Sequence, residues 1–95
     1  MRFDWDDAKA HENLRKHGVS FEEARTAFSD DQAILLPDPD HSVEEDRFVL
    51  IGLSSTLRVL TVVHGYRESD RVIRLISARR ATRSERAQYG ARWMK

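Results

Sequence analysis

Apolar and polar residues alternate along the second half of this chain in a way that predicts three consecutive strands. The apolar runs are "RFVLIGL" at 47–53, "LRVLTVVHG" at 57–65 and "RVIRLISA" at 71–78. The connections between them, "SST" and "YRESD", are too short for the crossover that parallel strands need. The pattern therefore predicts an antiparallel meander.

Three helices are predicted from residues that suit helix ends. Asp6 is placed to cap a helix that ends near His17, where Gly18 suits a left-handed cap. "SFEE" at 20–23 and "TRSE" at 82–85 are capping boxes, in which Ser or Thr precedes a glutamate by three positions. Each capping box predicts the start of a helix.

Two shorter apolar segments complete the predicted order of elements. Residues 2–5 and "QAILL" at 32–36 are strand candidates, whereas the proline- and acid-rich segment 37–46 predicts a loop. The order is then β-α-α-β-β-β-β-α. This order is typical of an α+β fold in which two N-terminal helices and one C-terminal helix pack on an antiparallel sheet. The length suits a single domain, residues 1–95.

Composition excludes several classes of chemistry. The chain has no cysteine, which removes disulfides and thiol nucleophiles, and its four histidines are scattered without helical pairing. No calcium-loop or glycine-rich phosphate pattern is present, so we expect neither a metal nor a cofactor. No apolar run approaches the roughly 18–20 residues of a membrane span, and the N-terminus lacks a signal region. We expect a cytoplasmic protein without membrane association.

The net charge of zero conceals a polarised chain. Residues 1–47 carry a net charge of −7, and residues 48–95 carry +7. Arginine supplies 13 of the 16 cations, and its planar guanidinium matches phosphate oxygens with paired hydrogen bonds. Two interpretations stay open: the basic half binds an anionic partner such as nucleic acid, or the two halves pair their charges with each other.

The segment from Arg71 to Trp93 concentrates the candidate binding groups. Strand alternation predicts that Arg79 emerges at the strand end on the face opposite Arg74. In the final helix one side carries Arg86, Tyr89 and Trp93, and another side, more suited to packing, carries Ala87, Ala91 and Met94. Arginines beside aromatic rings can hold phosphates and stack the bases of single-stranded RNA.

RNA cleavage without a metal needs a base, an acid and a cation that stabilises charge developing on the attacked phosphate. Arginine suits the last role because it stays protonated. Tyr89 and His64 are candidates for proton transfer, although a tyrosine with its reference pKa of about 10 depends on nearby cations. Core filling is the alternative for Tyr89. Lys9, Asn13 and Lys16 form a cationic stripe on the first helix, with a solvated face as the alternative.

Three stretches together resemble the BrnT family of type II toxin–antitoxin systems. They are "FDWDDAKAHENLRKHGVSFEEARTAF" at 3–28, "PDHSVEEDRFVLIG" at 39–52 and "IRLISARRATRSERAQY" at 73–89. The resemblance implies a RelE-like fold and a metal-independent endoribonuclease that inhibits translation. It also implies a BrnA-like antitoxin partner, expected in a 2:2 heterotetramer, through which the complex binds operator DNA and represses its own operon.

The resemblance also suggests site residues by position. The nearest matches to the catalytic groups of RelE-like toxins are Arg58, Arg79 and Tyr89, to which the residue chemistry adds His64. The predicted RNA-binding residues are Lys9, Lys16, Arg80, Arg83 and Arg86. Further family-pattern residues without an assigned role are His17, His41, Glu44 and Arg47. We expect the antitoxin to dock on the basic surface between Arg79 and Tyr89.

Two other functions are weighed against the toxin. The first is a non-catalytic nucleic-acid-binding module or transcriptional repressor, although no helix-turn-helix pair with a basic recognition helix is visible. The second is a structural subunit whose oppositely charged halves pair with a neighbour.

Overall fold

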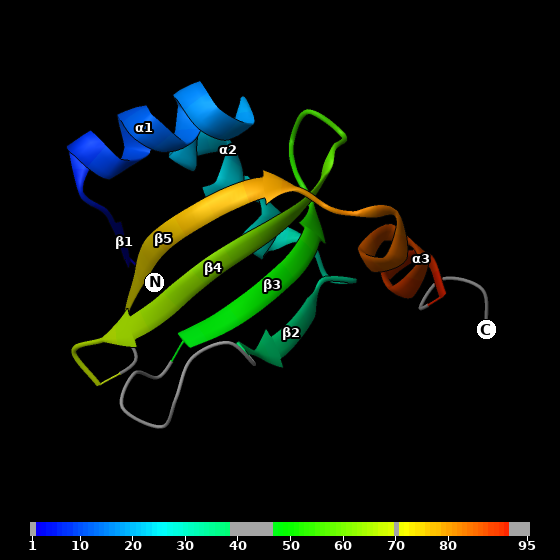
Figure 1. Cartoon of the computed structure of the whole chain (residues 1–95). Coiled ribbons are helices and arrows are strands. Elements are labelled where there is room, and N and C mark those ends of the chain that lie inside the picture. The colour runs from blue at the N-terminus through cyan, green and yellow to red at the C-terminus, as the bar shows by residue number, and fades with distance from the viewer. Residues whose placement is uncertain (1, 39–46, 70, 92–95) are drawn as a thin grey trace.

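The computed structural model describes residues 2–38, 47–69 and 71–91, which form a five-stranded sheet with helices on it (Figure 1). The elements are β1 (Arg2–Asp4), α1 (Asp7–His17), α2 (Phe21–Thr26), the 3-10 turn η1 (Ala27–Ser29), β2 (Ile34–Pro37), β3 (Arg47–Leu53), β4 (Val59–Arg67), β5 (Val72–Arg80) and α3 (Arg83–Ala91). The α+β order predicted from the sequence is confirmed. No helix in the described ranges is long and apolar enough to cross a membrane.

The strands lie in the order β1-β5-β4-β3-β2. The predicted meander is present, because β3, β4 and β5 pair antiparallel through short turns, and β2 extends it antiparallel to β3. β1 pairs parallel with β5, with Arg2 opposite Val72 and Asp4 opposite Arg74. The predicted antiparallel arrangement therefore holds for β2 to β5, and the parallel pairing of β1 makes the sheet mixed at one edge.

A β-bulge interrupts the pairing of β4 with β5. Val63 lies opposite Ser77, whereas the next residue, His64, lies opposite Leu75. Ile76 is therefore the extra residue on β5. A bulge of this kind bends its strand and changes the direction of the side chains that follow it.

The bulge overturns the predicted separation of two arginines. Three residues of β5 share the core beneath α1 and α2, namely Ile73, Leu75 and Ala78, although unbroken alternation would put Ala78 on the other face. Arg74 and Arg79 therefore both lie on the face that α1 and α2 leave open. The prediction that they occupy opposite faces is wrong, because it assumed an unbroken strand.

The sheet has one face covered by α1 and α2, and its other face is covered at one end by α3. Figure 1 shows α1 lying along β5, with α3 beyond the end of that strand. The first core is formed by Val19, Phe21, Ala24, Leu60, Val62, Ile73, Leu75 and Ala78. The second, smaller core is formed by Ile51, Ala81 and Tyr89.

The side chain of Asn13 completes the hydrogen bonding of β5. β1 ends opposite Arg74, so it leaves the outer edge of β5 without a paired strand beyond that residue. Asn13 Nδ2 donates to the carbonyl oxygens of Ala78 (2.8 Å) and Val19 (2.9 Å), and Asn13 Oδ1 accepts from Ala78 N–H (3.0 Å). Asn13 is buried, so it does not belong to the solvated stripe in which the sequence placed it.

We expect Asn13→Ala to lower the free energy of unfolding by about 2–6 kcal/mol, because two buried groups of Ala78 lose their partners at about 1–3 kcal/mol each. Urea denaturation at neutral pH measures the change. His11→Ala, at an exposed position of the same helix, is the control and is expected to stay within about 0.5 kcal/mol of the parent. An Asn13→Ala variant as stable as the control would contradict this role.

Candidate functional site

The open face of the sheet forms a groove of about 450 Å³. Its lining combines apolar side chains of β2 and β3 with polar groups where β5 meets α3. The residues that line it are Leu36, Pro37, Asp38, Arg47, Val49, Ile51, Thr61, Val63, Ile76, Ser77, Arg79, Glu85 and Gln88. The strand register places Thr61 directly opposite Arg79, so a hydroxyl and a guanidinium lie side by side at this polar end.

Glu85 holds the polar end of the groove together. Its carboxylate accepts hydrogen bonds from Arg79 Nη1 (2.7 Å) and Nη2 (3.0 Å), from Thr61 Oγ1 (2.9 Å) and from Thr82 N–H (2.7 Å). Glu85 N–H donates to Thr82 Oγ1 at 3.1 Å, which confirms the predicted capping box. A residue predicted only to start a helix therefore also joins β4, β5 and α3.

The charges of this pair are fixed at neutral pH. The Arg79 guanidinium, followed by hydrogen bonds from Thr82 and Thr61, outweighs burial and lowers the pKa of Glu85 to about 2. Glu85 in turn raises the pKa of Arg79. A carboxylate with so low a pKa is a poor proton acceptor near pH 7. Glu85 therefore orients Arg79 and is unsuited to act as a general base.

Arg79 keeps hydrogen-bonding capacity for a ligand. A guanidinium has five N–H donors, and two of those of Arg79 bind Glu85 while a third approaches the Arg80 carbonyl at 3.4 Å. The Arg79 side chain is 42% exposed although it is paired with Glu85. Two N–H donors are therefore left for an anion in the groove.

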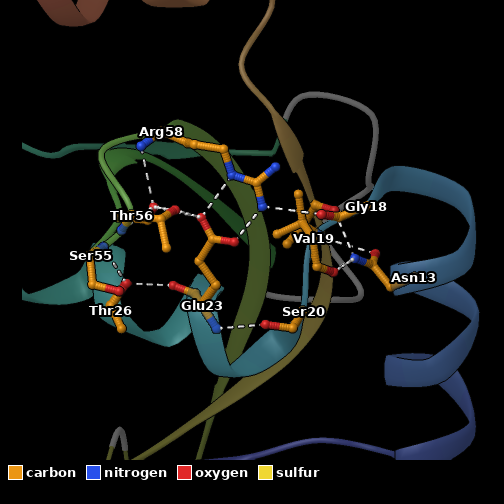
Figure 2. Close-up of polar contacts among 11 residues, drawn as sticks. Asn13, Gly18, Val19, Ser20, Glu23, Thr26, Ser55, Thr56 and Arg58 are labelled. Carbon is orange, nitrogen blue, oxygen red and sulfur yellow. Dashed lines mark hydrogen bonds and ion pairs between the residues drawn. The ribbon is translucent and has the colours of Figure 1, made fainter.

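Arg58 lies in a second glutamate–arginine pair, away from the groove. Arg58 binds Glu23 of α2 through Nη2 and through Nε at 3.0 Å, and it donates to the Gly18 carbonyl at 3.1 Å (Figure 2). Glu23 also accepts from the hydroxyls of Thr56 (2.5 Å) and Ser54 (2.7 Å). The predicted catalytic Arg58 therefore fastens the β3–β4 turn to α2, and the structure does not bring it together with Arg79.

The N-terminus of α2 departs from the predicted capping box in one respect. Ser20 Oγ accepts from Glu23 N–H at 3.0 Å, as expected, but the Glu23 side chain turns to Arg58 (Figure 2). The hydrogen bond from Arg58 contributes most to the low pKa of Glu23, which falls to about 2 although burial acts to raise it.

His64 lies in the core and not in the groove. It is fully buried, and its ring packs edge-on against Phe28 with centroids 4.8 Å apart. Burial lowers the pKa of His64, although the Val62 carbonyl near Nδ1 acts in the opposite direction. This placement does not favour the predicted role of His64 in proton transfer, because the imidazole is enclosed on the covered face of the sheet.

Tyr89 anchors α3 to the sheet. Its side chain is 6% exposed and packs with Ile51 and Ala81, and its hydroxyl donates to Asp30 Oδ2 at 2.5 Å. Burial raises the pKa of Asp30, but hydrogen bonds from Tyr89 and from the N–H groups of Leu53 and Gln32 outweigh it, so the pKa is below its ordinary value. This position favours the packing alternative for Tyr89 over acid–base chemistry.

Because Tyr89 turns toward the sheet, the side of α3 that was expected to pack is exposed instead. Ala87 and Ala91 both lie on the exposed side. Trp93 and Met94, which were each predicted to lie on one of these two sides of the helix, are outside the described residues.

The remaining candidates are dispersed. Arg80, Arg83, Arg86, Lys9, Lys16 and His17 are exposed. Arg80 and Arg86 line a smaller hollow with Arg58 at the end of the sheet, and Arg86 donates to the Ala81 carbonyl at 3.1 Å. Arg47 lines the groove, whereas His41 and Glu44 lie outside the described residues. Within residues 2–38, 47–69 and 71–91, no three histidine or acidic side chains are grouped to hold a metal ion.

Sequence reasoning missed several groove residues. Thr61, Ser77 and Gln88 carry no local signal, because their place in the groove depends on strand register and on the position of α3. Glu85 did carry a signal, the capping box. Arg79, at the end of the preceding strand, is the cation with which this glutamate pairs.

Comparison with known proteins identifies the family. The sequence profile described as "Ribonuclease toxin, BrnT, of type II toxin-antitoxin system" matches residues 5–85. This chain belongs to the BrnT family. The resemblance noted in the sequence is thereby confirmed, and the match includes Arg79 and Glu85 but ends before Tyr89.

Solved structures agree with this family. The 1.1-Å crystal structure of the Brucella abortus ribonuclease toxin BrnT is similar to this chain, with a TM-score of 0.68 and 25% sequence identity. The match covers 87% of this chain and 99% of the Brucella chain. A comparison with curated protein sequences gives no match. The BrnT-family fold is therefore shared over most of the chain.

Acid is expected to weaken the fold through Glu23 and Glu85. Their pKa values of about 2 lie below the ordinary 4.5, so their stabilisation is present above pH 4.5 and is lost as pH falls toward 2. Glu23→Gln and Glu85→Gln should therefore each flatten the decrease in free energy of unfolding between about pH 4.5 and 2. Urea denaturation across this pH range measures it, with exposed Glu22→Gln as the control for net charge. Slopes equal to the control would contradict the role of these pairs.

Tyr89→Phe separates anchoring from chemistry. We expect it to lower the free energy of unfolding by about 1–3 kcal/mol, because the hydroxyl bond to a carboxylate is lost, and to leave RNA cleavage by the folded protein unchanged. A double-mutant cycle with Asp30→Asn should show a coupling of about 0.5–3 kcal/mol. A large loss of cleavage with unchanged stability would instead make Tyr89 a catalytic residue.

Proposed function

We propose that this BrnT-family protein is a metal-independent endoribonuclease toxin that cleaves RNA in the cytoplasm and thereby inhibits translation. The observation that carries the proposal is the placement of Arg79. It lies at the polar end of an open groove, it is oriented by Glu85, and it retains free N–H donors. Membership of a ribonuclease toxin family supplies the reaction.

The proposed reaction begins when an RNA 2′-hydroxyl attacks the adjacent phosphorus, and the bond to the 5′-oxygen of the next nucleotide breaks. The products are a 2′,3′-cyclic phosphate and a 5′-hydroxyl. Negative charge builds on the phosphate oxygens in the transition state, where the fixed Arg79 guanidinium stabilises it. Because Glu85 holds the guanidinium in place beforehand, little reorganisation is needed when the charge develops.

The rest of the groove suits positioning of the RNA strand. Val49 and Val63 give an apolar floor on which a ribose or base can lie, and Ser77 adds a hydroxyl beside it. Glu85, His64 and Tyr89 are unsuited to proton transfer by pKa or burial. In this proposal Arg79 therefore acts through electrostatic stabilisation, while the 2′-hydroxyl gives its proton to water and the departing 5′-oxygen takes a proton from water.

A BrnA-like antitoxin is the proposed partner, since a type II toxin is neutralised by a protein. We place its docking surface over the groove, where it would cover Arg79. The groove combines a cation with the partly exposed Leu36, at 39%, and this combination suits an amphipathic segment that carries acidic side chains. A 2:2 complex that binds operator DNA through the antitoxin completes this proposal.

A non-catalytic nucleic-acid-binding module is the second candidate. The observation in its favour is that Glu85 partly neutralises Arg79 while both predicted proton-transfer residues are buried. Such a module would bind RNA or DNA in the groove and leave it intact, so the two functions differ in a cleavage assay.

Arg79→Ala is expected to reduce cleavage of single-stranded RNA by at least about 100-fold, because one preorganised stabiliser of transition-state charge is removed. Arg79→Lys should recover only part of the activity, since it keeps the charge but loses the planar fork. The assay is performed with purified protein in excess EDTA, and products are tested for a 2′,3′-cyclic phosphate. Arg71→Ala removes an exposed arginine at the other end of β5 and serves as the matched control.

The same variants apply in cells. Production of the wild-type chain without an antitoxin should arrest growth and fragment RNA, and Arg79→Ala should relieve both effects. A wild-type protein that leaves RNA intact and cells growing would eliminate the toxin proposal. Retention of a DNA or RNA probe without its cleavage would favour the second candidate.

A further inference from the structure

The groove continues across the outer edge of β5. Ile76 and Ser77, which line the groove, also line a second hollow of about 200 Å³ on the other side of that edge. The second hollow is completed by residues of α1, namely Lys9, Glu12, Asn13, Lys16 and His17. We call it the α1–β5 hollow. Its two shared residues place it next to the proposed cleavage site, across the edge of β5.

Two features of the fold create this proximity. β1 ends opposite Arg74, so no described strand covers the edge of β5 at Ile76. The bulge places Ile76 outside the regular alternation of β5, at the boundary of the two hollows. An extended ligand can therefore pass from the groove over this edge toward α1.

Asn13 places two lysines beside the same edge. Asn13 is bonded to Ala78 of β5, and Lys9 and Lys16 lie four residues before it and three residues after it, on the same side of α1. Both lysines are exposed, and their Cα atoms are about 10 Å apart along the helix axis. This separation suits two different phosphates of one strand better than a single bound anion.

The positive charge of the hollow is available to a ligand. Within the described ranges no carboxylate forms an ion pair with Lys9. Glu12, the one acidic residue of the hollow, is hydrogen-bonded by Arg15, with Nε to Oε2 at 3.0 Å, and it forms a longer ion pair with Lys16 at 3.8 Å. Because Arg15 makes the closer contacts with this carboxylate, the exposed Lys16 amine is only partly compensated. Asp6 is occupied as the cap of α1, where it accepts from Lys9 N–H.

We infer that the α1–β5 hollow is a second phosphate-binding site, in which Lys9 and Lys16 hold the backbone of an RNA strand that continues from the cleavage groove. This inference rests on the proposed function and identifies where the substrate extends beyond the reacting phosphate. RNA fits better than a protein segment because the hollow offers amines and a hydroxyl with Ile76 as its single large apolar residue. Docked helices need a broader apolar surface.

The test compares Lys9→Gln/Lys16→Gln with the wild-type protein. The probes are fluorescent single-stranded RNAs of about four and about twelve nucleotides, lengths within the range that one single-strand-binding domain covers. Uniform 2′-O-methylation prevents cleavage during binding measurements by anisotropy. Arg67→Gln/Arg71→Gln removes the same charge from exposed positions where β4 ends and β5 begins, and it is the matched control.

We expect the lysine variant to bind the longer RNA about tenfold more weakly. Its plot of log K against log salt concentration should be shallower by about 1.4, because each phosphate contact with a single strand contributes about 0.7 to the slope. The short RNA, which occupies only the groove, should be bound within about twofold of wild type, and the control should match wild type for both RNAs. With cleavable RNA, the KM of the longer substrate should rise while kcat is retained.

Different results separate the two proposals. Equal affinities and salt slopes for the lysine variant and the wild type would overturn the second site, even if the wild type cleaves RNA. A wild type that neither binds nor cleaves either RNA would overturn the proposed function itself. Loss of affinity for the short RNA as well would show that the lysines belong to the groove and not to a separate site. Urea midpoints confirm that each variant is folded.

Discussion

The free edge of β5 is the constraint on which the arrangement of this protein depends. β1 has only three residues, so the peptide groups of β5 near Ala78 need another partner inside the protein. Asn13 provides it, and the same amide binds the Val19 carbonyl. This one side chain therefore fixes α1 against the sheet and sets the start of α2. The position of the lysine-bearing helix beside the edge of β5 follows from that attachment.

Two glutamates at the same helical position give two arginines different roles. Glu23 and Glu85 both occupy the third position of a helix, and each binds an arginine from the sheet side of the molecule. The Arg58 side chain is 26% exposed and also bound to Gly18, whereas Arg79 is 42% exposed and opens onto the groove. Sequence alone ranked these arginines together. Exposure and the face that each occupies distinguish Arg58, which fastens a turn, from Arg79, the proposed phosphate ligand.

Local signals account for the elements, and tertiary contacts account for what the sequence failed to show. Capping boxes and short turns predicted the helices and the meander, because both depend on neighbouring residues. The bulge at Ile76 depends on the fit between β4 and β5, and Asn13 finds its partner 65 residues away. Neither feature is visible in local periodicity. Local periodicity also gave no sign that His64 is enclosed in the core. Strand alternation assigns a side chain to one face of the sheet, but it does not show what covers that face.

The sequence left two interpretations of the oppositely charged halves open, namely pairing with each other and binding of an anionic partner, and the structure is consistent with both. Glu23 with Arg58, Asp4 with Arg74, and Arg2 with Glu68 join the halves, so part of the polarity is internal. Lys9 and Arg80, in contrast, have no carboxylate partner within the described ranges. A phosphate at Arg79 can use the N–H donors that Glu85 leaves free, so binding need not break the pair that orients the guanidinium. Net charge therefore says little about where an anion would bind, because the cations that remain after internal pairing set the local attraction for the proposed RNA strand.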